Sequence, residues 1–264
     1  TTLRMYHGNT GTLTAALATT SVWDSSFKMV QHFEETSGSA TDSTTNSYNG
    51  TINGVTQNQA GQIGQGVVFD GTTDYITLNK SDIATDWTFS AWVNRTNSNE
   101  PGSLLMDSAS DSLRLEQWSG TDDIGVTKYG VADYRFTPNT EAAIGSWSHI
   151  AMVGSGGTTV TLYVNGSLVE ADSVPNIELP MTTIGATAYS LVGSLDEVHA
   201  SDSARVAAWI KAEYNNQNNA TQGGFYTDVG ASTLGISSTS GAVTLTANTM
   251  AINSTITATG QTVT

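Results

Sequence analysis

Apolar and polar side chains alternate with a period of two in many short stretches between residues 27 and 200, as they do in half-buried β-strands. In the clearest stretch, residues 87–93, every odd-numbered position is apolar. Such stretches predict strands at residues 67–69, 75–78, 87–93, 103–106, 112–115, 147–153, 160–164 and 168–169. Many short strands separated by turn-forming residues predict an antiparallel β-sandwich.

Two dipeptides mark tight turns between these strands. Asp70-Gly71 follows the strand at residues 67–69, and Asn165-Gly166 separates residues 160–164 from residues 168–169. Asn-Gly favours the two-residue hairpin turn because both residues tolerate a positive φ. The sequence therefore predicts a β-hairpin centred on Asn165-Gly166.

One segment near the C-terminal end of this region has the spacing of an α-helix. Ser203 is a candidate N-cap, and an Asn/Gln-rich run at residues 215–219 is expected to end the helix. The apolar positions at helical spacing are Val206, Trp209, Ile210 and Tyr214. We expect Trp209 to pack the helix against the sandwich.

The two ends of the chain differ from the region between them, residues 27–219. Residues 1–26 are too short to fold alone and are expected to be the tail of a preceding domain or a docked strand. Residues 220–264 alternate small apolar residues with Thr and Ser, so each strand would offer little apolar surface. This pattern favours an oligomerisation or fibre segment that buries its strands against other chains or repeats, and a flexible tail is the alternative.

Composition narrows the classes of function. The chain has 264 residues, of which 12% are charged, and its formal net charge is -15. That charge repels phosphate groups, so we expect neither nucleic-acid binding nor attraction to anionic membranes, and it favours divalent cations where carboxylates converge. The absence of Cys excludes disulfides and thiolate chemistry.

No apolar run is long enough to span a bilayer as a helix, so membrane insertion is not expected. The chain opens on Thr1 and shows no export signal. We therefore expect the sequence to be a mature, excised or processed segment of a longer protein.

The middle region resembles a known family. The resemblance lies in residues 67–76, 89–93, 147–151, 162–166 and 193–198, followed by the helical segment 206–214. In this order they resemble laminin-G-like domains of the concanavalin A-like lectin/glucanase superfamily, of the type in prokaryotic or viral surface proteins. The resemblance implies a two-sheet antiparallel jelly roll with one short C-terminal helix, and an extracellular, cell-surface or virion-surface location. Residues 3–8 also resemble the last strand of a small domain that precedes this one in prokaryotic surface proteins.

Catalytic activity is not expected. Glycosidases of the superfamily carry the pattern Glu-x-Asp-x-x-Glu on one strand, and their chemistry needs two carboxylates at a fixed separation. The nearest match, Glu170-Ala171-Asp172, lacks the final Glu. The adjacent acidic pairs at residues 34–35 and 122–123 would point to opposite faces of a strand.

The resemblance also implies a calcium site. Residues 34–50 form an oxygen-rich loop similar to a family loop whose Asp meets the Asp of the closing strand around calcium. Here the pair would be Asp42 and Asp196, helped by backbone carbonyls and Asn46. The alternatives are that Asp196 caps a turn or forms a buried ion pair with Arg205 or Lys211.

Five residues outside the core strand motifs are candidate ligand contacts. Sugar rings stack on aromatic faces, and binding sites combine aromatic walls with a few polar groups. The candidates are Trp118, Tyr129, Tyr134, Arg135 and Tyr189. The alternative for each aromatic residue is a structural role in closing the ends of the sandwich.

These observations predict a non-catalytic carbohydrate-binding or adhesion module of an extracellular or virion-surface protein. Its partner would be a glycan or a cell-surface polysaccharide, and the C-terminal segment would allow homo-oligomers. One alternative is a structural or assembly protein without glycan binding, such as a fibre head or a capsid or surface-layer decoration. A glycoside hydrolase is the second alternative.

Overall fold

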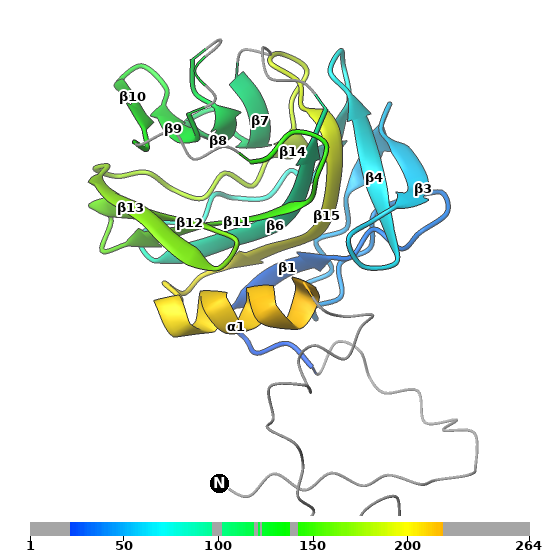
Figure 1. Cartoon of the computed structure of the whole chain (residues 1–264), viewed down its shortest axis with the longest axis horizontal. Coiled ribbons are helices and arrows are strands. Elements are labelled where there is room, and N and C mark those ends of the chain that lie inside the picture. The colour runs from blue at the N-terminus through cyan, green and yellow to red at the C-terminus, as the bar shows by residue number, and fades with distance from the viewer. Residues whose placement is uncertain (1–21, 97–101, 119–120, 122, 138–141, 219–264) are drawn as a thin grey trace, which may run out of the picture. The chain divides into compact units, whose positions relative to one another are not determined.

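The computed structural model describes residues 22–96, 102–118, 121, 123–137 and 142–218. Within these residues the chain forms two antiparallel sheets and one helix (Figure 1). The predicted all-β sandwich with a short helix is therefore confirmed. The predicted segments 1–26 and 220–264 lie almost wholly outside the described residues and stay predictions.

The larger sheet has eight strands. Its order is β13 (Ser167–Ser173), β12 (Thr159–Val164), β11 (Ser148–Ser155), β6 (Trp87–Arg95), β15 (Val192–Ser201), β4 (Gln65–Asp70) and β3 (Thr56–Ala60), with β1 (Phe27–Gln31) paired to β15. The order of the seven-stranded sheet is β10 (Ala132–Arg135), β9 (Gly125–Lys128), β8 (Asp111–Glu116), β7 (Gly102–Asp107), β14 (Thr183–Gly185), β5 (Tyr75–Thr77) and β2 (Thr51–Asn53). Neighbours such as β15 and β6 are distant in sequence, as in a jelly roll.

The main core lies between the two sheets. Trp87 and Phe89 from β6 pack in one buried cluster with Leu113, Leu115 and Val126 from the other sheet. Side chains alternate between the two faces of a strand, so each of these strands sends its opposite residues to an outer face. That alternation decides which polar and aromatic residues reach the surface.

The predicted hairpin joins β12 and β13. Asn165 and Gly166 have φ values of 51° and 68°, so both turn residues adopt the left-handed conformation that favours Asn-Gly. This prediction is confirmed.

The helix α1 (Ala207–Asn218) packs against the outer face of the eight-stranded sheet, on the side away from β7–β10 (Figure 1). Ile210 is fully buried there against Ala151, Val153 and Tyr163, and the partly buried Trp209 packs against the same cluster, as predicted.

The predicted N-cap was wrong. The carbonyl of Val206 accepts the first helical hydrogen bond, from Ile210 N, so Val206 occupies the cap position. The carbonyl of Ser203 instead accepts from Thr88 Oγ1 in the sheet. None of the described helices is long and apolar enough to cross a membrane.

Candidate functional site

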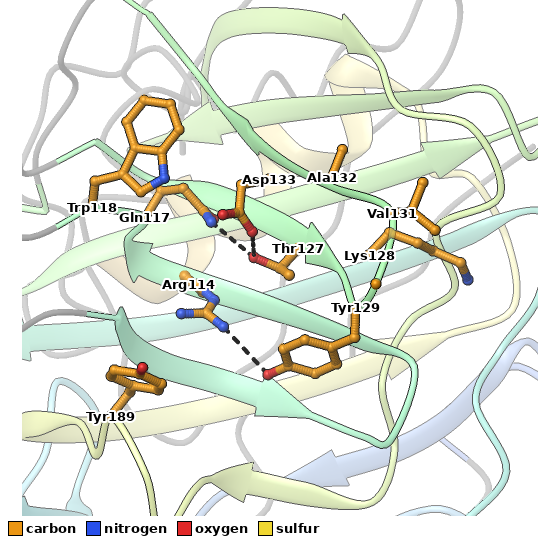
Figure 2. A pocket seen from close by; sticks show the side chains of 11 residues that line it. Arg114, Gln117, Trp118, Thr127, Lys128, Tyr129, Val131, Ala132, Asp133 and Tyr189 are labelled. Atoms are coloured by element: carbon orange, nitrogen blue, oxygen red, sulfur yellow. Dashed lines mark hydrogen bonds between the residues drawn. The ribbon is translucent and has the colours of Figure 1, made fainter.

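A groove with a volume of 620 Å³ lies on the seven-stranded sheet, over β8, β9 and β10 (Figure 2). We call it the aromatic groove. Its lining residues are Arg114, Gln117, Trp118, Thr127, Lys128, Tyr129, Gly130, Val131, Ala132, Asp133 and Tyr189. Three of the five predicted ligand contacts, Trp118, Tyr129 and Tyr189, are therefore brought together from separate segments.

Strand alternation places the polar groups of the groove. Arg114 lies between two core residues of β8 and so points to the outer face, where its Nε donates to Ser112 Oγ at 3.0 Å. On β10, Asp133 faces the groove and the next residue, Tyr134, packs against the core. Tyr134 was predicted as a ligand contact, and the structure does not bring it into the groove.

Exposed apolar surface gathers in the groove. The described residues include eight large hydrophobic side chains that are exposed, and four of them line it: Trp118, Tyr129, Val131 and Tyr189. Trp118 is 43% exposed and Tyr189 is 55% exposed. Tyr189 also has a φ of 59°, a left-handed backbone that non-glycine residues adopt infrequently and that is enriched at functional sites.

Arg114 lies on the floor of the groove between two tyrosine rings. Its Cζ is 5.9 Å from the ring centre of Tyr129 and 5.4 Å from that of Tyr189. Its Nη2 donates to the Tyr129 hydroxyl at 3.3 Å, and that hydroxyl donates to Asp107 Oδ1 at 2.8 Å. Burial raises the pKa of Tyr129 and that of Asp107. The Tyr129 hydroxyl therefore stays protonated, and its hydrogen bonds to Asp107 and Arg114 hold the guanidinium of Arg114 in one orientation.

A second hydrogen-bond chain orders the other wall. Gln117 Nε2 donates to Thr127 Oγ1 at 2.8 Å, and this hydroxyl donates to Asp133 Oδ1 at 2.7 Å (Figure 2). Both chains hold polar side chains in place before any ligand arrives, which lowers the entropy lost on binding.

Arg135, another predicted contact, lies at the rim of the groove. Its guanidinium carbon is 4.8 Å from the ring centre of Trp118, and its Nη1 is paired with Asp123 Oδ2 at 2.8 Å. Arg135 therefore supports one side of the Trp118 ring. Lys128, in the groove wall, is paired with the buried Asp111 at 3.1 Å.

The predicted calcium residues are not brought together. Asp42 lies next to β1, where its carboxylate accepts hydrogen bonds from the backbone N–H groups of Val30, Thr44 and Tyr48 and from Thr44 Oγ1. Its segment bridges to Gln31, and Gln31 pairs on its other side with Val198 in β15. The strand β1 therefore separates the Asp42 segment from the strand that carries Asp196, and the predicted pairing was wrong.

Asn46 and Asp196 each have other partners. Asn46 Nδ2 donates to the carbonyls of Phe27 and Lys28, so it fastens its loop to β1. Asp196 Oδ2 accepts from Ile63 N at 2.8 Å, and burial raises the pKa of Asp196 to about 7. Arg205, an alternative partner of Asp196, pairs with Asp24 instead. Calcium binding by the chain stays a prediction.

The structure also contains a buried cluster that the sequence analysis missed. We call it the His/Glu cluster: His32, Glu197 and His199, with Glu213 from α1 behind them. Burial disfavours the ionised carboxylates, yet hydrogen bonds from the histidines lower the pKa of Glu197 and that of Glu213 to about 2. The only signal in the sequence was the polar residues of the 196–199 segment, and nothing there pointed to residue 32.

A two-sheet jelly roll with an aromatic groove on one outer face defines a lectin-like sandwich. The family model described as the concanavalin A-like lectin/glucanases superfamily, Laminin_G_3, matches residues 70–211, which include every residue of the groove. The chain belongs to this superfamily. No curated protein matches the chain.

Several solved structures share the fold. The binding domain of Paraclostridial Mosquitocidal Protein 1 is 17% identical with a TM-score of 0.56, over 72% of this chain and 52% of that one. Domain 4 of AbnA, an extracellular GH43 arabinanase from Geobacillus stearothermophilus solved with arabinotriose, is 18% identical with a TM-score of 0.56, over 70% and 97%. The binding domain of Botulinum Neurotoxin DC in complex with SialylT is 15% identical with a TM-score of 0.54, over 73% and 52%. The chain thus spans about half of each toxin domain.

Proposed function

We propose that this chain is a non-catalytic carbohydrate-binding module and that the aromatic groove holds the glycan. The observation that carries the proposal is the meeting of Trp118, Tyr129 and Tyr189 in one groove, from three separate segments. Aromatic faces give a sugar ring a large contact area at a small cost in conformational entropy, and a few polar groups set its orientation.

The polar side chains suit sugar hydroxyl groups. Arg114 uses its Nε and Nη2 in the hydrogen bonds described above, and the described residues provide no carboxylate in ion-pair contact with it. Its remaining N–H groups are available as donors, and the second oxygen of Asp133 is available as an acceptor. A hydroxyl-rich ligand needs both kinds of group.

The chemistry of the groove favours binding over hydrolysis. Glycoside cleavage uses two carboxylates about 5–9.5 Å apart, one of them able to protonate the leaving oxygen. Among the described residues that line the groove, Asp133 is the one carboxylate, and it accepts a hydrogen bond from Thr127.

Two relatives in fold support the ligand class, because one was solved with arabinotriose and one with SialylT. Our proposal includes an extracellular or virion-surface location for this chain. Support for that location comes from the extracellular arabinanase that carries a domain of the same fold.

The test is a glycan array with the full chain, run once with calcium and once with EDTA. We expect binding to a defined set of glycans, and Trp118→Ala should abolish most of the signal. Leu168→Ala is the control, since Leu168 is exposed and does not line the groove. Folded protein that binds no glycan in either condition would overturn the proposal and favour a structural or assembly role.

A further inference from the structure

Three side chains with metal-binding groups converge beside β1, on the outer face of the eight-stranded sheet. His32 Nδ1 is 2.8 Å from Glu197 Oε1, and His199 Nε2 is 3.2 Å from Glu197 Oε2. One ligand atom from each of the three residues lies within 4.8 Å of the other two. Glu197 and His199 are buried, and His32 is partly exposed.

The fold builds this convergence with a local irregularity. The pairing of β15 with β6 shifts register between Asp196 and His199, which marks a β-bulge. Within the bulge Glu197 has a φ of 49°, a left-handed conformation that is costly for a residue with a side chain. Bulges re-aim side chains and occur often at functional sites, and here the bulge directs Glu197 toward both histidines.

A second carboxylate fixes the orientation of His199. Glu213 Oε1 from α1 lies 2.8 Å from His199 Nδ1 and accepts a hydrogen bond from Ser90 Oγ at 2.9 Å. When His199 is neutral, the proton on Nδ1 is donated to Glu213, and the lone pair on Nε2 then points toward Glu197 and His32. A carboxylate on the far nitrogen of a histidine is the usual support of a metal ligand.

We propose that His32, Glu197 and His199 bind a zinc ion. Two imidazole nitrogens and one carboxylate form a common donor set for zinc, with a fourth position left for water. Zinc bonds of about 2.0–2.2 Å in a tetrahedral arrangement separate neighbouring ligand atoms by about 3.3 Å. The two histidine-to-carboxylate separations, 2.8 Å to Glu197 Oε1 and 3.2 Å to Oε2, lie within about 0.5 Å of that value. The three ligand atoms lie within 4.8 Å of one another, so closing them around one ion needs shifts of at most about 1.5 Å.

Charge and access fit a dication as well. Glu197 and Glu213 are buried carboxylates whose charge is balanced by hydrogen bonds with His199, and a zinc ion on Nε2 would replace the proton that His199 shares with Glu197. A cleft of 280 Å³ between α1 and Trp23 has His199 and Glu213 among its lining residues. The His32 side chain is 33% exposed, so solvent reaches the proposed ligands at this residue.

The proposal is tested by calorimetry and thermal unfolding of the full chain with zinc chloride. We expect one zinc ion per chain and a melting temperature that rises by about 3 °C or more when zinc is in large excess over its dissociation constant. His32→Ala should weaken the affinity about 100-fold, and Glu213→Gln, which keeps all three ligands, about 10-fold.

The control variant is Glu178→Gln, which removes one carboxylate of the other convergent acidic group, Asp82, Asp111 and Glu178. It should bind zinc with unchanged affinity. Cobalt(II) gives a readout that does not depend on stability, because tetrahedral nitrogen and oxygen ligands produce strong visible absorption. We expect these bands in the wild-type chain and their loss in His32→Ala.

The proposal is overturned if the folded wild-type chain releases or absorbs no heat on titration with zinc and shows no absorption bands of tetrahedral cobalt(II). The same holds if His32→Ala binds zinc as tightly as the wild type, or if Glu178→Gln loses as much affinity as His32→Ala. The His/Glu cluster would then be an ion-pair network that docks α1. These outcomes are independent of glycan binding.

Discussion

The two outer faces of the sandwich are both built from strands whose residues alternate between core and surface, but one face is covered by a helix and part of the other is open. On the eight-stranded sheet, α1 packs over outward residues of β6, and its side chains accept hydrogen bonds from them: Ser90 donates to the buried Glu213, and Trp92 donates to the partly buried Gln217. On the seven-stranded sheet, the outward residues of β8–β10 form the open aromatic groove. A covered outer face supports the fold, and an uncovered outer face is available to a ligand.

The largest effect should come from the covered face. Ile210→Ala removes a fully buried side chain that packs α1 onto the sheet, and we expect it to lower the free energy of unfolding by about 2–4 kcal/mol. Chemical denaturation followed by fluorescence measures the change. Val206→Ala, at a position 68% exposed, should change it by less than about 0.5 kcal/mol. Equal losses in the two variants would mean that α1 does not dock as described.

A smaller loss of stability is expected at the edge of the covered sheet. Asp42→Asn removes the charge that organises four donors, so the free energy of unfolding should fall by about 1.5–3 kcal/mol. Melting curves with calcium and with EDTA should show the same loss. A loss that appears only with calcium would restore Asp42 as a calcium ligand.

Substitutions on the open face should lower the affinity for glycan and leave the free energy of unfolding nearly unchanged. Tyr189→Ala removes an exposed ring from the groove, and we expect the affinity for a glycan found on the array to fall about 10-fold, which is about 1.4 kcal/mol. Calorimetry measures the affinity for the glycan, and chemical denaturation measures the free energy of unfolding. Tyr134→Ala is the matched variant, because its ring packs on the core and its loss should mainly reduce stability. The reverse pattern would contradict the assignment of the two faces.

The smallest effect is expected at Arg114. Arg114→Lys keeps the charge but loses the planar group held between Tyr129 and Tyr189, so glycan affinity should fall by about three- to fivefold. The same titration measures it. An unchanged affinity would remove Arg114 from the binding site while leaving the aromatic contacts in place.

Much of the site was visible in the sequence, and its limits have physical causes. Trp118, Tyr129 and Tyr189 were predicted because an aromatic residue in a polar segment has no strand core of its own to enter. Tyr134 met the same criterion, yet β10 is a strand whose alternation turns Tyr134 inward and Asp133 outward. Four residues are too few to reveal that alternation in advance.

The sequence by itself determined part of the local structure: the eight strands predicted from the pattern of apolar residues, the hairpin at Asn165-Gly166 and the helix. These follow from neighbours a few positions apart, whose periodicity and turn propensity act before any distant contact forms. Only the tertiary structure decided which side chains meet. It placed β1 between Asp42 and Asp196, and it brought His32 against Glu197 across 165 positions of sequence. Strand order is the reason, because pairing in a jelly roll joins segments whose separation leaves no local pattern.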